Sequence, residues 1–89
     1  MSNSRVPLCL PDLELPRARI TISQWLVGRH KRVTAGERLV EILADGVTVD
    51  LPAPVTGELA EIVVFEDDEV SVGQPLCWIL PVEVEGAGE

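Results

Sequence analysis

Val40–Pro54 reads VEILADGVTVDLPAP, and this stretch decides the fold. Asp45-Gly46 lies at its centre, between two runs rich in apolar residues. The type I′ turn that favours tight hairpins needs a positive φ at both central residues, which Gly adopts freely and Asp tolerates. The stretch therefore predicts a β-hairpin with Asp45-Gly46 as its two-residue loop.

A two-residue loop also sets the register of the hairpin. Three apolar pairs then share one face: Ala44 with Val47, Ile42 with Val49, and Val40 with Leu51. The other face carries Leu43, Thr48 and the facing acids Glu41 and Asp50. A shift of one residue would mix apolar and polar side chains on both faces, so the pattern favours this register alone.

The chain contains an internal repeat with an offset of 37 residues. Trp25–Leu43 (WLVGRHKRVTAGERLVEIL) aligns with Ile62–Leu80 (IVVFEDDEVSVGQPLCWIL). Identical residues stand at strand and turn positions, namely Val27/Val64, Val33/Val70, Gly36/Gly73, Leu39/Leu76, Ile42/Ile79 and Leu43/Leu80. Such a repeat predicts two similar halves, each of which needs the other to bury its apolar face. Extended to the first strand, the same offset places Cys9 opposite Gly46.

Length and composition predict one all-β domain. The chain has 89 residues, 46% hydrophobic and 3% aromatic, which fits a single core of Val, Leu and Ile. Arg5–Pro11 and Ile20–Val27 are predicted strands, the first at a sheet edge because of Pro7. We expect a domain over residues 5–82, a disordered tail at 1–4 and an acidic, Gly-rich tail at 83–89. The initial Met and the final Gly-Ala-Gly-Glu suggest a complete short reading frame.

The charge balance narrows the class of partner. A net charge of −8 disfavours nucleic acid and anionic membranes, and favours a protein with a basic face. No apolar run approaches the roughly 20 residues of a membrane span, and the N-terminus does not resemble a signal peptide. A cytoplasmic location is the default expectation.

The string LVEILADGVTVDLPAPVTG resembles the centre of a lipoyl domain, the carrier module of 2-oxo acid dehydrogenase complexes. The resemblance covers roughly residues 6–81. It implies a flattened β-barrel of two four-stranded antiparallel sheets related by a pseudo-twofold axis. In that family the hairpin tip reads Asp-Lys-Ala, and lipoic acid is joined to the lysine. Here Gly46 takes that position, between Asp45 and Val47, so no cofactor is expected.

A second departure lies in the loop after the first strand. Pro11-Asp12-Leu13 matches the family pattern, but Glu14 stands where members usually have Gly. In the family this loop lies beside the lipoyl-lysine and helps the dehydrogenase recognise its carrier. We therefore expect a partner surface at the hairpin end, made of Glu14, Asp45, Gly46, Glu66, Asp67, Asp68 and Glu69.

Two equivalent turns of the repeat carry opposite charge. Arg29-His30-Lys31-Arg32 aligns with Glu66-Asp67-Asp68-Glu69. Charge runs are usually solvated surface, and that interpretation stays open here. The alternative is a dipolar module that docks head-to-tail or meets a partner at its acidic end.

The sequence offers no catalytic or metal-binding set. Lys31, the chain's single lysine, lies in a turn away from the hairpin tip, and biotinylation is disfavoured because Ala-Met-Lys-Met is absent. His30 is the single imidazole, and adjacent acids do not reproduce an EF-hand loop. Cys9 and Cys77 are too few for a disulfide framework, and a redox role for Cys9 is only a hypothesis.

The leading hypothesis is a non-enzymatic, lipoyl-domain-like protein that binds an acyltransferase, dehydrogenase or ligase component, or regulates a carrier complex by mimicry. The alternative is a carrier domain of a dihydrolipoamide acyltransferase component, active beside lysine-bearing homologues or as part of a longer chain. A third interpretation takes Gly46 as a substitution in an otherwise working carrier.

Overall fold

The fold was analysed in a computed structural model that describes residues 4–15 and 17–82. The tails predicted at 1–4 and 83–89 lie outside these residues, apart from Ser4. The described residues form β-strands and no helix, with strands β1 (Val6–Cys9), β2 (Ile20–Trp25), β3 (Arg32–Val33), β4 (Arg38–Ala44), β5 (Val47–Pro52), β6 (Gly57–Ile62) and β7 (Pro75–Pro81). None of the described segments is therefore a candidate membrane-spanning helix.

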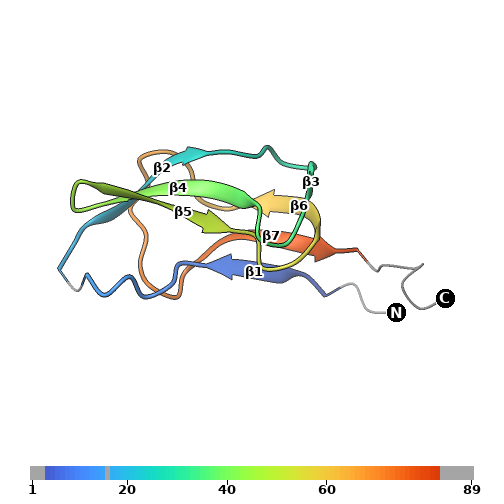
Figure 1. Ribbon diagram of the computed structural model, residues 1–89, viewed down its shortest axis with the longest axis horizontal. Helices are drawn as coiled ribbons and strands as arrows, with labels where there is room; N and C mark the ends of the chain where they lie inside the picture. Colours follow the sequence, from blue (N-terminus) through green and yellow to red (C-terminus); the bar gives the residue numbers. More distant parts are fainter. Residues whose placement is uncertain (1–3, 16, 83–89) are drawn as a thin grey trace.

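The strands form two antiparallel sheets that face each other (Figure 1). One has the order β1-β7-β6-β3 and the other the order β2-β4-β5. This confirms the predicted all-β architecture of two antiparallel sheets. The second sheet has three strands because its fourth is reduced to an isolated bridge between Thr21 and Glu69.

The central hairpin has the predicted register. Ala44 pairs with Val47, Ile42 with Val49, and Val40 with Leu51. Asp45 has φ 52° and Gly46 has φ 81°, as a type I′ turn requires. The tip lies at one end of the elongated molecule, and β1 and β7 carry the chain termini at the other end (Figure 1).

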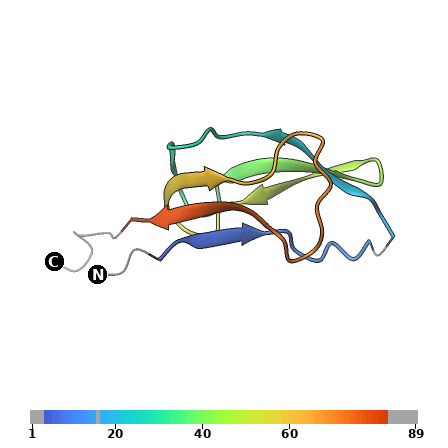
Figure 2. The same cartoon turned by 180° about the vertical axis from the view of Figure 1, so that it is seen from behind.

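The first two strands are shorter than predicted. β1 lies at a sheet edge, as Pro7 indicated, but it ends at Cys9. β2 begins at Ile20 as predicted and ends at Trp25. The described residues between them, 10–15 and 17–19, form a loop that runs from β1 past residues 69–74 to the hairpin end (Figure 2).

The predicted repeat relates the two halves of the domain by a pseudo-twofold axis, and equivalent residues have similar backbone φ angles. His30 and Asp67, which are 37 residues apart, have φ 75° and 73°. Gly36 and Gly73 have φ 90° and 87°. Glu37 and Gln74, which the repeat relates, also make equivalent hydrogen bonds. Glu37 Oε1 accepts from Thr34 N, and Gln74 Oε1 accepts from Ser71 N, both at 2.9 Å. The two halves therefore share a turn conformation despite opposite charge.

The equivalence of Cys9 and Gly46 was wrong. Cys9 pairs with Pro75, whereas Pro52 pairs with Arg38, the repeat mate of Pro75. Cys9 therefore corresponds to Pro52, an offset of 43 residues. The physical reason is that β1 and β5 are the related edge strands, and the loop after β1 is six residues longer than the loop after β5.

The core lies between the sheets and is apolar throughout. No polar or charged side chain of residues 4–15 and 17–82 is buried. Both halves contribute fully buried side chains, such as Ile42 with its repeat mate Ile79, and Leu39 with Leu76. Because burying one such side chain stabilises a fold by about 1.5–3 kcal/mol, the sheets hold each other in place.

Gly57 yields a test of this packing. A Cβ at Gly57 would overlap the carbonyl oxygen of Leu80 and lie 2.8 Å from Pro81 Cα, and both are backbone atoms that cannot rotate away. We expect Gly57→Ala to lower the free energy of unfolding by about 3 kcal/mol, the upper part of the range for overpacked sites. Urea denaturation measures this loss.

Gly28→Ala is the matched control, because a Cβ at Gly28 meets nothing within 4 Å. It should change the free energy of unfolding by less than about 1 kcal/mol. Equal stability of the two variants would contradict the close approach of β6 and β7 at Gly57.

Candidate functional site

The hairpin tip projects into solvent from a buried base. Ala44 is fully buried, whereas Val47, its pairing partner, is 57% exposed. A Cβ placed at Gly46 would meet nothing within 4 Å. The tip therefore presents Asp45, Gly46 and Val47 outward, with the space for a side chain at Gly46.

Glu14 holds a strained backbone conformation next to the tip. Its φ is 62°, in the left-handed region, where a residue with a Cβ costs about 1–2 kcal/mol relative to its usual conformations. Asp12 Oδ1 accepts a hydrogen bond from Glu14 N at 2.8 Å, which is the local turn bond that Asp side chains favour. The loop thus keeps a glycine-type conformation at the position where the family usually has Gly.

The acidic turn at Glu66–Glu69 is fastened to β2 by backbone hydrogen bonds. Asp67 N donates to Ile22 O at 2.9 Å, and Ile22 N donates to Asp68 O at 3.0 Å. Because Ile20 at the start of β2 pairs with Ala44 beside the tip, these bonds place the acidic turn at the hairpin end. The carboxylate of Asp68 also accepts from Phe65 N at 2.8 Å.

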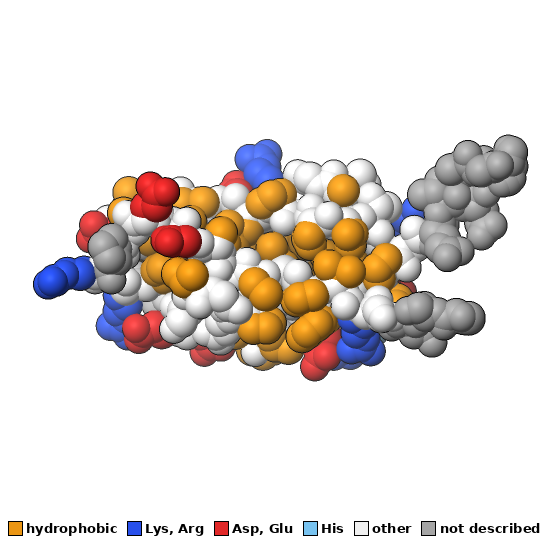
Figure 3. All heavy atoms as spheres, turned by 90° about the horizontal axis from the view of Figure 1, so that it is seen from below, with side chains coloured by type: hydrophobic (Ala, Val, Ile, Leu, Met, Phe, Trp, Pro, Cys, Tyr) orange, Lys and Arg blue, Asp and Glu red, His pale blue; other side chains and the backbone are white. Residues whose placement is uncertain are grey.

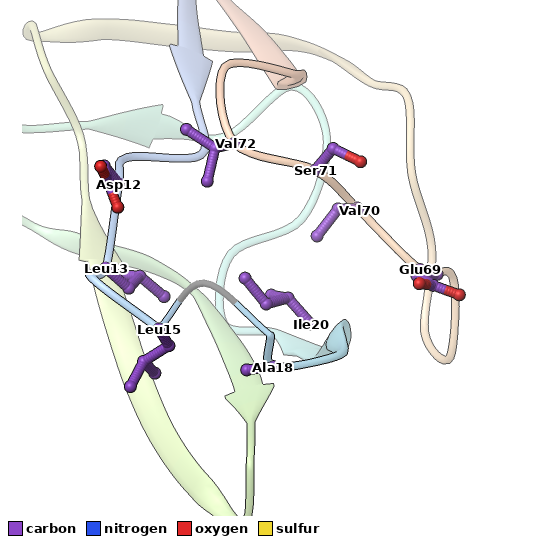
Figure 4. A pocket seen from close by; sticks show the side chains of 9 residues that line it. All are labelled: Asp12, Leu13, Leu15, Ala18, Ile20, Glu69, Val70, Ser71 and Val72. Carbon is purple, nitrogen blue, oxygen red and sulfur yellow. The ribbon is translucent and has the colours of Figure 1, made fainter.

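Two adjoining hollows join these segments. The first lies between the loop after β1 and residues 69–72, and six of its nine lining residues are apolar, although polar atoms supply much of its exposed surface (Figure 4). Its apolar wall consists of Leu13, Leu15, Ala18, Ile20, Val70 and Val72. The second hollow is lined by Leu15 and Ala18 again, together with Glu14, Arg17 and Asp45. Leu15 and Ala18 therefore connect the tip with the acidic turn.

The hollows bring together only part of the predicted partner surface. Glu14 and Asp45 meet in the second hollow, and Glu69 borders the first. Gly46 and the other three turn acids line neither hollow. Sequence reasoning missed the apolar residues between them, because Leu15 and Ala18 lie in a loop without periodicity. The length of that loop was the available signal.

Charge is distributed unequally between the two ends of the molecule. The two hollows and the adjoining acidic turn hold seven carboxylates, of Asp12, Glu14, Asp45, Glu66, Asp67, Asp68 and Glu69, against the two guanidinium groups of Arg17 and Arg19. Figure 3 shows acidic side chains gathered at the hairpin end and apolar side chains over the middle of the face. Arg19 pairs with Glu69 at 3.4 Å, an exposed contact of small energy.

The basic turn at residues 29–32 lies at the other end and is partly neutralised. Arg29 Nε donates to His30 Nε2 at 3.1 Å, which places the ring proton on Nδ1. Nδ1 then faces Glu58 Oε2 at 3.1 Å. Lys31 is exposed in this turn, directly before β3, and β3 lies at the opposite end of the molecule from the hairpin tip between β4 and β5 (Figure 1).

The thiols do not form a disulfide. Cys9 is half-buried and Cys77 is fully buried, and both are free. Burial raises the pKa of the Cys77 thiol from its ordinary value of 9.0 to about 11, with a smaller contribution from Cys9, against the lowering effect of a backbone hydrogen bond at Leu8. Among the described residues, no three His, Cys, Asp or Glu side chains are grouped to hold a metal ion.

Known proteins resemble this chain in both sequence and structure. The biotin and lipoyl family, described as biotin-requiring enzyme, matches residues 12–79. The acetyltransferase component of the pyruvate dehydrogenase complex of Corynebacterium glutamicum is 39% identical over 70 residues, which cover 79% of this chain and 10% of that protein. The lipoamide acyltransferase component of the branched-chain alpha-keto acid dehydrogenase complex of Bacillus subtilis is 31% identical over 80 residues, 90% of this chain and 18% of that protein.

A solved structure shows the same architecture. The lipoyl domain of the 2-oxoglutarate dehydrogenase complex from Azotobacter vinelandii superposes with a TM-score of 0.72 at 27% identity, and covers 88% of this chain and 99% of that domain. The chain therefore matches a whole lipoyl domain, and it spans less than a fifth of either acyltransferase component.

The two thiols are expected to differ in reactivity and in their effect on stability. Native protein at pH 8 should release one equivalent of chromophore from a disulfide reagent, from Cys9, and a second only after unfolding. Between pH 9 and pH 11 an unfolded Cys77 loses its proton while the native thiol keeps it, so stability falls as the pH rises, by about 1.4 kcal/mol per unit.

Cys77→Ala supplies the comparison, because it removes this titration. Its free energy of unfolding should fall less steeply over the same pH interval. Parallel pH profiles of the two proteins, or two fast-reacting thiols in the native wild type, would contradict the buried state of Cys77.

Proposed function

Because the chain belongs to the biotin and lipoyl family and resembles the lipoyl domains of 2-oxo acid dehydrogenase acyltransferases, we propose that it acts as a lipoyl-type module without a lipoyl group. In this role it binds a protein component of such a complex and catalyses nothing itself. The single observation behind the proposal is Gly46 at a tip whose surroundings match the family framework.

The geometry of the tip supports a protein-binding role. Asp45 and Gly46 keep the two positive φ angles of the tight turn, and the space around a side chain at Gly46 is open. Lys31, the one amine on a side chain, lies in the basic turn at the far end. A module of this shape offers the carrier's outline to a partner while holding no acyl group.

A carrier role is the second candidate, favoured by the names of the relatives. The two proteins compared above are acyltransferase components, in which this chain would correspond to one module. In that case the chain would be lipoylated on Lys31, or would serve beside lysine-bearing modules. Its intact mass after co-expression with a lipoyl ligase and lipoate tests the first of these carrier roles, because a binding module stays unmodified and any lipoyl increment rejects it.

Affinity capture tests the proposed partner class. The wild-type domain, immobilised through its C-terminus so that the tip is free, should retain dehydrogenase, acyltransferase or ligase components of a 2-oxo acid dehydrogenase complex from its source cell. Mass spectrometry identifies them. A control domain with Gly36→Lys, which carries its change before β4 and away from the tip, should retain the same proteins. Capture of none of these components by the wild type would refute the proposal.

Gly46→Lys tests whether the tip still has the shape that a ligase reads. The φ of 81° costs a lysine about 1–2 kcal/mol, and the space around the tip is open, so we expect a folded variant. Co-expressed with a lipoyl ligase and lipoate, it should gain one lipoyl group, seen in its intact mass.

Gly36→Lys is the matched control here as well, because Gly36 has φ 90° and equally open space. It should show the same loss of stability and no lipoylation. A folded Gly46→Lys that stays unmodified would mean that the surroundings of the tip have diverged too, and would contradict mimicry of a carrier.

A further inference from the structure

The two halves of the domain differ most in the loops that follow their edge strands. β1 and β5 are related by an offset of 43 residues, but β2 and β6 by 37. The loop of residues 10–19 is therefore six residues longer than its mate, residues 53–56. The extra residues stand at the hairpin end, beside the tip.

The longer loop borders the first hollow, which lies open to solvent beside residues 69–72. In Figure 4 the side chains of Leu13, Ile20, Val70 and Val72 point toward its centre.

Part of the apolar lining is exposed to solvent. Leu15 is 38% exposed and Val72 is 56% exposed. Because Leu15 and Ala18 line both hollows, the two form one groove from the acidic turn to Asp45. A groove that joins two hollows suits an extended segment of polypeptide, and its apolar residues suit an aliphatic side chain.

Carboxylates border this groove along its whole length. Asp12 and Glu69 stand at the first hollow, and Glu14 and Asp45 at the second. Arg17 is the one cation that lines the groove, and Arg19 is already paired with Glu69. With seven carboxylates against two arginines, this end of the domain is complementary to a cationic ligand.

We propose that this groove binds an extended basic segment of a protein partner, with an aliphatic side chain on the apolar floor and flanking arginine or lysine side chains on Glu14 and Glu69. The inference rests on the proposed function and names the chemistry of its partner. Attraction between unlike charges speeds association and selects basic segments, while the buried aliphatic side chain fixes their register.

A labelled peptide tests the charge requirement. Fluorescein-labelled Arg-Arg-Leu-Arg-Arg is titrated with the whole protein at about 50 mM salt, where screening is weak, and anisotropy reports binding. Glu14→Gln with Glu69→Gln should weaken binding about tenfold, equivalent to ~1.4 kcal/mol. Glu58→Gln with Glu61→Gln, the same loss of charge at the other end, should change the affinity less than about twofold. Equal losses in both double variants would overturn the proposal.

A second measurement tests the apolar floor. Replacing the central Leu of the peptide by Ser should weaken its binding to the wild-type protein about fivefold. The same replacement should weaken binding to the Leu15→Ser variant by less than about twofold, because the contact between the peptide Leu and Leu15 is already lost in that variant. Leu15 is partly exposed, so Leu15→Ser should stay folded, as circular dichroism can verify. A preference for Leu that persists in Leu15→Ser would overturn the placement of the side chain in the groove.

The outcomes also separate this inference from the proposed function. Capture of complex components by a wild type that does not bind the peptide would refute the groove and leave the proposed function standing. Peptide binding without capture of any complex component would refute the proposed function and leave the groove standing. Self-association in sedimentation that the peptide abolishes would mean that the basic turn of a second copy occupies the groove, and would overturn the assignment to a partner.

Discussion

Burial of one apolar core between two repeated halves is the constraint on which the structure depends. Each sheet buries its inner apolar face against the other sheet, so each half is stable only against the other. Ile42 and Ile79, which the repeat relates, are both fully buried, and no described polar side chain shares the core with them. The strands and their register therefore follow from one requirement, that every inward position be apolar.

The equivalent turns at residues 29–32 and 66–69 show that the apolar core does not determine the charge of the surface. His30 and Asp67 occupy equivalent positions with nearly the same φ, although one turn is basic and the other acidic. Glu37 and Gln74 close their turns through the same atom and the same distance. The backbone thus tolerates a reversal of charge without a change in conformation. Charge at these turns is free to serve recognition, because the fold does not need either sign.

The hairpin could be predicted because it depends on short-range order, and the repeat and the family could be predicted because their residue patterns are visible in the sequence itself. Asp45-Gly46 restricts the turn, and alternation along β4 and β5 restricts the register. The path of the loop after β1 could not be predicted, since its contacts are with residues 69–72, far along the chain. The misplaced mate of Cys9 has the same origin: the offset of 43 residues is visible in Val6/Val49, Leu8/Leu51 and Pro11/Pro54 only when β1 and β5 are known to be related.

The core accounts for the hairpin tip but not for the loop beside it. Ala44 and Ile42 are fully buried, so stability alone keeps the hairpin whether or not its tip carries a lysine. Glu14, by contrast, is exposed and holds a left-handed conformation that Gly would adopt without strain. The hydrogen bond from Glu14 N to Asp12 Oδ1 supports this conformation locally, and the remaining strain directs the search for function to this loop.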